Sequence, residues 1–359
     1  MNQNAQTKKM IVTAALPYAN GAIHLGHMVE HCMVDFWVRF QKMQGHDCIF
    51  ICADDTHGTP IMVKAREMGM PAEKWIEFSL QEHTSDLKGF QIHYDHYSWT
   101  HSPENTKWAH HFFAKMQEAG SIEVRKISQA YCPQDNMFLP DRYIKGICPK
   151  CHSTDQYGDN CDKCGSTYSP TEMQSPQCTL CGTTPITKDS DHIFFKLNNY
   201  KEFLQDWVAK HTQKEVGNKL QEWFNEDLRD WDISRDAPYF GIEIPGFANK
   251  FFYVWLDAPI GYISTTEQYC KQNGKNLEDY WRHGEIYHFI GKDILYFHTL
   301  FWPAMLKAAG FNPPNFVNVH GFLTVNGEKM SKSKGTFISA RSYLQNLDPL
   351  YYRFFLATR

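Results

Sequence analysis

Two kinds of apolar pattern alternate over the first 55 residues, and this alternation restricts the fold more than any other feature. Met10–Leu16 is a short, nearly continuous apolar run that predicts a buried strand, and a loop containing a glycine follows it. Apolar residues then recur at helical spacing from Leu25 to Met43, and Cys48–Ala53 predicts a second strand. This order is a βαβ unit with a right-handed crossover, so we expect an α/β protein with a Rossmann-like parallel sheet.

The alternation is interrupted over residues 119–245, which are rich in cysteine, glycine, proline, serine and threonine. It resumes at Lys250–Leu256 and continues with a strand, a helix and a strand at Ile286–Ile290, Asp293–Ala309 and Phe316–His320. We therefore expect one sheet domain made of residues 1–118 and 246–322 and split by a connective insertion over residues 119–245.

A fourth part is expected over residues 323–359. Asn326-Gly327 is the strongest short signal for a two-residue β-hairpin, and it leads directly to Lys329. The last segment, Ser339–Arg359, has a helical pattern.

Composition sets further limits on the class of protein. The chain has 359 residues, of which 42% are hydrophobic, as in ordered globular proteins, and its formal net charge of −4 provides no overall basic field for nucleic acid. Lys8-Lys9 before the first apolar run resembles the start of a signal peptide, but the run is short and a buried strand is the better interpretation. No apolar run of about 18 residues is present, so we expect no membrane segment.

Two short motifs suggest a site for a nucleoside triphosphate. His24-Leu25-Gly26-His27 stands at the start of the first predicted helix, where backbone N–H groups and the helix dipole favour anions. Its two histidines share one face of the helix, and Gly26 leaves room for a nucleotide close to the backbone. Alone, the motif would more often be an ordinary helix start with surface histidines.

The second motif, Lys329-Met330-Ser331-Lys332-Ser333, places two lysines beside hydroxyl donors after the predicted hairpin. A Lys/Ser-rich run is usually a solvated surface segment. Here it follows a predicted strand of the parallel sheet, so we expect it to face the same crevice as His24 and His27.

The two motifs in this order resemble those of class I aminoacyl-tRNA synthetases, and the segments between them resemble the methionyl-tRNA synthetases. The segments that carry this resemblance are Leu16-Pro-Tyr-Ala-Asn-Gly21, Cys52-Ala-Asp-Asp-Thr-His-Gly58, Trp231-Asp-Ile-Ser-Arg-Asp-Ala-Pro238, Phe252-Tyr-Val-Trp-Leu-Asp-Ala-Pro-Ile-Gly-Tyr262 and Phe289-Ile-Gly-Lys-Asp-Ile294. The resemblance covers essentially the whole chain. It implies activation of L-methionine by Mg·ATP to methionyl-adenylate and pyrophosphate, followed by transfer to the 3′ end of tRNA(Met), including the initiator tRNA.

The resemblance also implies roles for individual residues. His24 and His27 would stabilise the transition state, Lys332 helped by Lys329 would hold pyrophosphate, and Asp293 would bind the ribose hydroxyls. Gly26, Gly291 and Ser331 would complete the ATP site. The methionine pocket would be lined by Leu16, Tyr18, Trp255, Pro259, Tyr262, Ile294 and His298, with Asp55 paired to the α-ammonium group. From the residues alone, aromatic positions such as Trp255 and Tyr262 are more often part of a core.

Three Cys-x-x-Cys pairs lie in the insertion, among eleven cysteines in all. The spacing of Cys148, Cys151, Cys161 and Cys164 suits a closed zinc site of four thiolates, which would be structural. A redox function would need a thioredoxin-like context that is absent here, and clustered thiolates favour the reducing cytoplasm. An outer site of Cys132, Asp135, Cys178 and Cys181 fits the order of the ligands; methionyl-tRNA synthetases have either one metal knuckle or two, so both counts stay open.

The resemblance leaves one departure and two alternatives. The family continues with a helical anticodon-binding domain beyond the part matched by residues up to Arg359, so we expect a catalytic core followed by the start of a stem-contact domain. Another class I synthetase for an apolar amino acid would need a larger editing insertion. A zinc-ribbon module that binds nucleic acid would explain the cysteines and leave the paired phosphate motifs unexplained.

Overall fold

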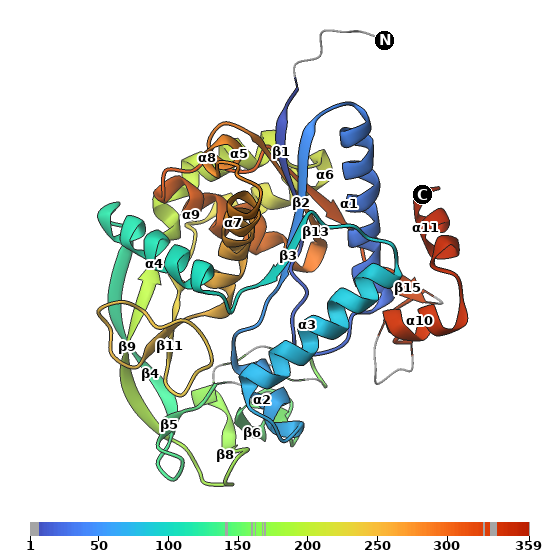
Figure 1. Cartoon of the computed structure of the whole chain (residues 1–359). Coiled ribbons are helices and arrows are strands. Elements are labelled where there is room, and N and C mark those ends of the chain that lie inside the picture. Colours follow the sequence, from blue (N-terminus) through green and yellow to red (C-terminus); the bar gives the residue numbers. More distant parts are fainter. Residues whose placement is uncertain are drawn as a thin grey trace.

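A five-stranded parallel sheet forms the centre of the protein (Figure 1). The computed structural model describes residues 7–140, 143–158, 161, 163–166, 168, 170–325, 327–330 and 336–358, without the side chains of Val325, Glu328 and Lys329. The strand order is β14-β13-β1-β2-β3. The strands are β1 (Lys9–Ala14), β2 (Asp47–Asp54), β3 (His96–Trp99), β13 (Glu285–Gly291) and β14 (Phe316–His320). This architecture confirms the α/β fold expected from the first 55 residues.

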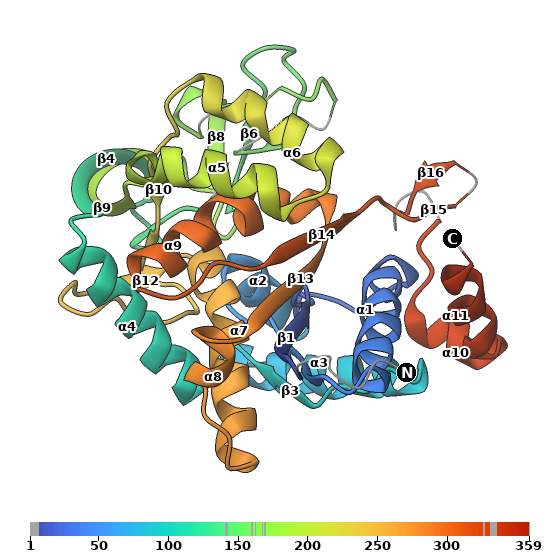
Figure 2. The same cartoon turned by 90° about the horizontal axis from the view of Figure 1, so that it is seen from above.

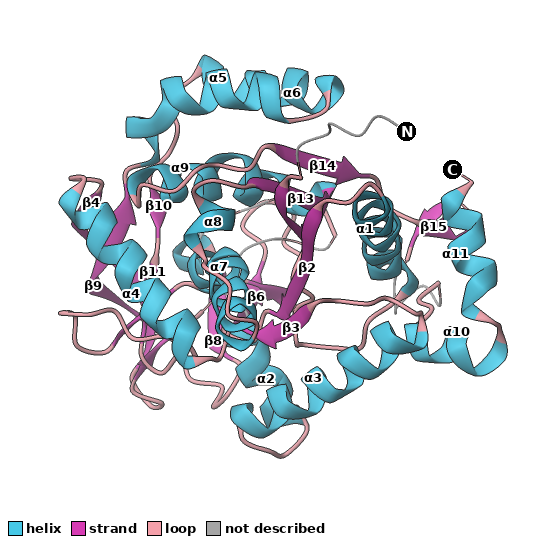
Figure 3. Ribbon diagram, turned by 45° about the horizontal axis from the view of Figure 1, so that its top comes forward, coloured by secondary structure: helices cyan, strands magenta, loops and turns pink. Residues whose placement is uncertain are grey.

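Alternate residues of β1 and β2 enter two different apolar cores, as the two-residue period of a strand requires. Ile11 and Ile49 point into one core, which contains residues of α4 (Pro103–Glu118), α7 (Val254–Gln272) and α9 (Trp302–Ala308). Val12 and Phe50 point into the other, which contains residues of α1 (Leu25–Met43). Helices therefore cover both faces of the sheet, and Figure 3 shows α1 and α7 on opposite sides of it.

The predicted helix Asp293–Ala309 is wrong as a single element. It consists of the 3₁₀ turn η5 (Lys292–Ile294), the π-helical turn η6 (Phe297–Phe301) and then α9. Pro303 stands in the first turn of α9 and has no N–H to donate to the preceding turn, which explains why the regular helix begins there. Outside the predicted elements, α2 (Thr59–Glu67), α3 (Ala72–Gly89) and α8 (Glu278–Trp281) complete the sheet domain.

The insertion folds around antiparallel strands, in contrast to the parallel sheet. β4 (Ile122–Cys132) and β9 (Ile186–Phe195) form a long ribbon flanked by β5 (Met137–Phe138) and β10 (Trp231–Asp232). A second sheet has the order β7-β6-β8, from β6 (Ile144–Ile147), β7 (Gln156–Tyr157) and β8 (Gln174–Cys178). The turns η2 (Pro170–Glu172), η3 (Leu197–Tyr200) and η4 (Glu222–Asn225) and the helices α5 (Lys201–His211) and α6 (Lys214–Gln221) complete this region.

Contrary to the prediction from the sequence, the segment from Lys250 does not return the chain to the parallel sheet. β12 (Lys250–Phe252) pairs antiparallel with β11 (Ser234–Asp236) in a separate two-stranded sheet, and α7 begins at Val254. The parallel sheet itself returns only at β13, because the intervening chain forms this ribbon and the long helix α7.

The C-terminal part packs against the start of α1. The predicted hairpin is confirmed by the antiparallel pair β15 (Thr324–Val325) and β16 (Glu328–Lys329), although Asn326 lies outside the described residues. The predicted helical segment is divided into α10 (Ala340–Asn346) and α11 (Pro349–Ala357), because Pro349 begins a new helix that is capped by Asp348. Figure 2 shows both helices beside α1.

Two backbone hydrogen bonds join this part to the first motif. The N–H of Leu25 donates to the carbonyl of Ile338 at 3.1 Å, and the N–H of Ala340 donates to the carbonyl of Ile23 at 2.9 Å. Among the helices of the described residues, none combines the length and apolar character needed to cross a bilayer.

Candidate active site

The His-Leu-Gly-His motif forms the capped N-terminus of α1. His24 is the N-cap residue, and its Nδ1 accepts a hydrogen bond from the backbone N–H of His27 at 3.4 Å. His27 returns the bond, because its Nδ1 accepts from the backbone N–H of His24 at 3.2 Å. A backbone N–H can only donate, so each imidazole that accepts it at Nδ1 carries its hydrogen on Nε2 when neutral.

The surroundings of His27 favour its neutral form. Desolvation, followed by the nearby His24, lowers the pKa of His27 well below its usual value. The two rings stack with their centroids 3.8 Å apart. A β-carbon at Gly26 would lie 2.8 Å from the His24 ring and 2.9 Å from the Met330 side chain, so any larger residue there would force these side chains to move.

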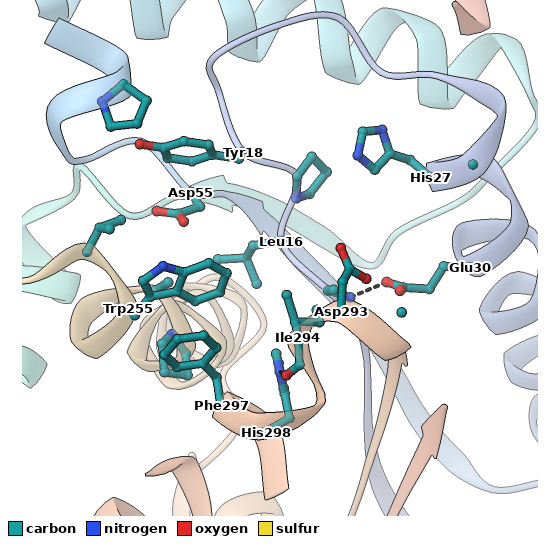
Figure 4. A pocket seen from close by; sticks show the side chains of 18 of the residues that line it. Leu16, Tyr18, His27, Glu30, Asp55, Trp255, Asp293, Ile294, Phe297 and His298 are labelled. Atoms are coloured by element: carbon teal, nitrogen blue, oxygen red, sulfur yellow. Dashed lines mark hydrogen bonds between the residues drawn. The ribbon is translucent and has the colours of Figure 1, made fainter. Parts of the chain in front are cut away.

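A cavity of about 580 Å³ opens at the carboxyl ends of the parallel strands, where open α/β sheets bind ligands. Figure 4 shows that side chains from the segments directly after β1 and β2, from α1 and α7, and from the turns after β13 converge on it. It gathers every predicted ATP-site and methionine-site residue whose side chain the structure describes: Leu16, Tyr18, His24, Gly26, His27, Asp55, Trp255, Pro259, Tyr262, Gly291, Asp293, Ile294 and His298. Their assigned roles stay predictions.

The lysine motif is described only in part. Met330 lines the cavity. The backbone of Lys329 belongs to β16, but its side chain, together with Ser331, Lys332 and Ser333, lies outside the described residues.

The floor of the cavity presents a buried carboxylate. Asp55 is 6% exposed, and no described residue forms a hydrogen bond with its Oδ1 atom. Burial, followed by the charge of Asp257, raises the pKa of Asp55 well above its usual value. Beside it, the hydroxyl of Tyr18 donates to the carbonyl of His57 at 2.9 Å. An incoming ammonium group would supply the partner that this oxygen needs.

Aromatic rings form the opposite wall. Trp255 and Phe297 stack with ring centroids 4.1 Å apart and planes 8° from parallel. His298 Nδ1 faces the carbonyl of Ile294 at 3.2 Å, so this nitrogen carries the hydrogen, and Nε2 accepts from the Tyr262 hydroxyl at 2.8 Å. Burial lowers the pKa of His298 to about 4, which keeps the ring neutral.

Both cysteine-rich groups predicted from the sequence assemble in the insertion. In each group the four ligand atoms lie within 4.8 Å of one another, the inner group being Cys148, Cys151, Cys161 and Cys164 and the outer group Cys132, Asp135, Cys178 and Cys181. In the inner group the sulfurs of Cys148 and Cys164 are 3.9 Å apart and those of Cys151 and Cys161 are 3.5 Å apart. Tetrahedral zinc with bonds of about 2.3 Å separates its sulfurs by about 3.8 Å, so the arrangement fits this metal.

The outer group has a similar geometry. The sulfurs of Cys132 and Cys181 are 3.4 Å apart, and a carboxylate oxygen of Asp135 lies 3.1 Å from the Cys178 sulfur. Each ligand pair closes a tight turn, because the residue after its second ligand is left-handed: Asn136 (φ 52), His152 (φ 57), Gly165 (φ 71) and Gly182 (φ 75). The four turns share one design, and the residues present can therefore hold two metal ions.

Comparison with known proteins identifies the family. A family model described as tRNA synthetases class I (M) matches residues 10–359. The chain belongs to this family.

Individual members agree with this assignment. The methionine–tRNA ligase of Bdellovibrio bacteriovorus is 59% identical over 355 residues, which make up 98% of this chain and 52% of that protein. The chain thus spans about half the length of this curated relative. Two solved structures of Mycobacterium tuberculosis methionyl-tRNA synthetase with methionyl-adenylate each have a TM-score of 0.76 and 24% identity, and they cover 98% and 97% of this chain and 64% of their own. At this identity the likeness to them shows the fold.

Within this synthetase fold, the cavity also contains residues that sequence reasoning missed. Glu30 accepts a hydrogen bond from the backbone N–H of Ala15 and contacts His320 Nε2 at 3.2 Å (Figure 4). The guanidinium of Arg235 lies 3.7 Å from the ring centroid of Tyr253. Glu30 follows His27 by three positions on the sheet-facing side of α1, and a charged residue on that side was the available signal.

Proposed function

We propose that this chain carries the catalytic site of a methionine–tRNA ligase. The methionine carboxylate would attack the α-phosphorus of Mg·ATP, the bond to the bridging oxygen would break, and pyrophosphate would leave. As part of the whole protein, the site would then pass methionine to the 3′ end of tRNA(Met), including the initiator tRNA. One observation carries the proposal: a single cavity joins the N-terminus of α1, with His24 and His27, to the buried carboxylate of Asp55.

The nucleotide would lie along the N-terminus of α1. With Nδ1 of His24 and His27 occupied by backbone N–H groups, their Nε2 hydrogens are the ones suited to phosphate oxygens. The positive end of the helix adds to this attraction. Gly26 and Gly291 would give close approach to the nucleotide, and Asp293 would bind the ribose hydroxyls.

Lys332, helped by Lys329 and Ser331, would hold the departing pyrophosphate. If Lys332 acts mainly on the transition state, Lys332→Ala should lower kcat and kcat/KM together. We expect a loss of about 2–4 kcal/mol of activation free energy.

The methionine would lie between the Asp55 carboxylate and the aromatic wall. Asp55 would pair with the α-ammonium group, while Leu16, Tyr18, Trp255, Pro259, Tyr262, Ile294 and His298 would surround the side chain. The hydrogens of Tyr262 and His298 are already donated within the wall, so the thioether would meet polarizable rings and lone pairs rather than a donor. The ordered Tyr262–His298 pair would fix the shape of the pocket.

Zinc is the metal that we propose for the two cysteine-rich groups. Thiolates are its usual ligands in structural sites, and the four-cysteine group leaves no position for a reacting water. Its function here would be to hold the insertion together. The remaining metal requirement is Mg²⁺, which would enter bound to the ATP substrate.

Residues 1–118 and 246–322 are proposed as the two halves of the catalytic domain, residues 119–245 as the connective insertion, and residues 323–359 as the lysine loop and the start of a stem-contact domain. Another class I synthetase for an apolar amino acid is less consistent with the family match, and a nucleic-acid-binding zinc ribbon does not account for the cavity. The cytoplasm, where tRNA is charged, is the proposed location.

Methionine-dependent exchange of pyrophosphate into ATP tests the proposed activity directly. We expect the chain alone to catalyse the exchange with methionine and to respond far less to isoleucine, valine or leucine. Equal exchange with all four amino acids would contradict the methionine assignment, and no exchange with any of them would contradict the activity itself.

A further inference from the structure

Helix α3 holds the loop that leads from β1 to the first motif. The indole Nε1 of Trp75 donates to the carbonyl of Ala19 at 2.7 Å, and the Ser79 hydroxyl donates to the same carbonyl at 3.2 Å. One turn further, Nε2 of His83 lies 2.9 Å from the carbonyl oxygen of Gly21. These three side chains follow each other at four-residue intervals, so one face of α3 lies along the loop.

The other nitrogen of His83 contacts a buried carboxylate. Nδ1 lies 2.9 Å from Oδ1 of Asp54, and the side chains of the two residues are 1% and 0% exposed. A carboxylate and a carbonyl both accept hydrogen bonds and neither can donate. With Asp54 ionised, both ring nitrogens carry hydrogen, which makes His83 an imidazolium.

Charged and titratable groups surround His83 on β2, on β3 and on α3 itself. On β2 stands Asp54, and on β3 the Tyr97 hydroxyl donates to the same oxygen of Asp54. On α3 itself, Glu82 and Asp86 are paired with Arg341 of α10 at 2.8 and 3.1 Å. Against desolvation, which opposes the charge, the Asp54 carboxylate and the Gly21 carbonyl raise the pKa of His83 above its usual value.

The charge of His83 also reaches α1. Desolvation is the largest cause of the low pKa values of His27 and His31. The charge of His83 is the next cause for His31, and for His27 it follows those of His24 and His31. A cation beneath the loop thus helps to keep His27 neutral. It also adds positive potential where the helix N-terminus already favours phosphate.

Through Arg341, helix α3 also contacts α10, which follows the lysine motif. Figure 1 shows α3 running from α2 to α10. Ala340, the first residue of α10, is hydrogen-bonded to Ile23, and Ile338, two residues earlier, is hydrogen-bonded to Leu25, on the two sides of His24. Helix α3 therefore contacts both the loop that precedes His24 and the helix α10, whose first residue is hydrogen-bonded beside His24.

We propose that His83, as an imidazolium bridging Asp54 and the Gly21 carbonyl, is a positioning residue that fixes the loop before His24 for phosphate chemistry. This inference rests on the proposed function. It adds a protonation requirement: the bridge exists while His83 is charged and is lost as the pH rises through its raised folded-state pKa, because the neutral ring leaves one of the two oxygens without a donor.

The test is the pH profile of pyrophosphate exchange at saturating methionine and ATP, from about pH 6 to about pH 9.5. For the unaltered chain we expect kcat to fall on the alkaline side. His83→Gln should lower kcat about tenfold or more at neutral pH, with smaller changes in both KM values, and should remove the alkaline fall. An altered chain that keeps the alkaline fall would overturn the proposal.

His192→Gln is the matched control. His192 also faces two oxygens, from Asp232 at 2.7 Å and Asp236 at 2.9 Å, and is equally buried, but it lies on β9 and is absent from the α3 contacts with the loop. We expect this variant to keep the alkaline fall. If His192→Gln removed the fall as well, the effect would not be specific to His83 and the positioning role would be wrong.

Two further measurements decide the matter if His83→Gln does not fold. Tyr97→Phe takes one hydrogen-bond donor from Asp54, so the carboxylate should interact more strongly with the His83 imidazolium and raise its pKa further. The alkaline fall of kcat should then move to higher pH. A fall at unchanged pH would contradict the proposal. In ¹⁵N spectra of the unaltered chain, both His83 nitrogens should be protonated at about pH 7. A neutral ring there would overturn the inference even if exchange is robust, whereas absent exchange with a charged ring would refute the proposed function instead.

Discussion

The parallel sheet and the cysteine-rich part of the insertion are stabilised in different ways. Five of the six residues of β1 and seven of the eight residues of β2 are buried, and apolar cores cover both faces of the sheet. In β6 one residue of four is buried, in β8 one of five, and in β7 none. Apolar burial can hold the sheet. The small sheet of β6, β7 and β8 has only a small apolar cluster beside it, so we expect its stability to depend on metal bound by the two cysteine-rich groups.

The largest expected effect is the removal of metal. Structural zinc contributes about 10–16 kcal/mol of apparent binding free energy, so chelation should unfold the segment from Ile144 to Cys181 and leave the parallel sheet intact. Hydrogen exchange followed by mass spectrometry should show rapid exchange in peptides of β6 and β8 and continued protection in β1 and β13. Simultaneous loss of protection in both regions would remove the distinction between them.

Elemental analysis and pH sharpen the same prediction. We expect about two zinc ions per chain, one in each group of ligands, and Cys178→Ser should lower the count to one. Because the ligands must be thiolates, metal should leave as the pH falls and the sulfurs become protonated. A metal content near zero in freshly purified protein would refute the zinc assignment.

Removing a large side chain from the core of the sheet domain should destabilise the sheet and leave the metal content unchanged. Phe112 is fully buried and stacks on Trp302 and Phe311 at centroid distances of 5.6 and 5.8 Å. Phe112→Ala should lower the free energy of unfolding by about 3–5 kcal/mol, measured by urea denaturation, with an unchanged zinc content. Phe78→Ala, at a position that is 44% exposed, serves as the control and should change stability by about 0.5 kcal/mol or less.

Removing one hydroxyl from the cavity wall should have a smaller effect. Tyr262→Phe leaves Nε2 of the buried His298 without its donor, which should cost about 1–3 kcal/mol. We expect a higher KM for methionine in pyrophosphate exchange and weaker discrimination against aliphatic amino acids. Unchanged kinetic constants for methionine would show that the Tyr262–His298 pair does not shape the pocket.

The smallest effect is expected for an ion pair in the insertion. Lys145 and Asp155 are 2.9 Å apart, with side chains that are 34% and 75% exposed. Asp155→Asn removes the charge and keeps a residue type that tolerates the left-handed backbone there. The free energy of unfolding, measured by thermal denaturation, should therefore change by no more than about 0.5 kcal/mol. A larger loss would mean that surface charges, and not the ligands alone, hold this region.

The same contrast explains what the sequence could predict. The helix Leu25–Met43 and the strand Phe316–His320 begin and end where the sequence predicts. The spacing of apolar residues within each segment is enough to indicate which element forms. The ligand groups were also predictable, since spacing alone brings Cys148 near Cys151. The division of Asp293–Ala309 was missed because Pro303 acts on the turn before it, and α7 was missed because its buried face extends nearly all around the helix.

The candidate site was predictable where residues belong to recognisable motifs. All its described members, from Leu16 to His298, line one cavity. The partners of these residues could not be predicted: the bond from Ala15 to Glu30 and the bridge from His83 to Gly21 depend on how α1 and α3 pack, and no local pattern specifies that packing.

The strand order has a consequence for synthesis on the ribosome. β1 pairs with β2 almost at once, but its other edge waits for β13, where Met10 meets Glu285. At about 5–20 residues per second, a growing chain needs roughly tens of seconds to bridge that gap. Throughout this time an apolar strand edge is open to pairing with other nascent chains. We therefore expect the yield of folded protein to depend on how well this edge is kept from pairing with other chains until β13 is made.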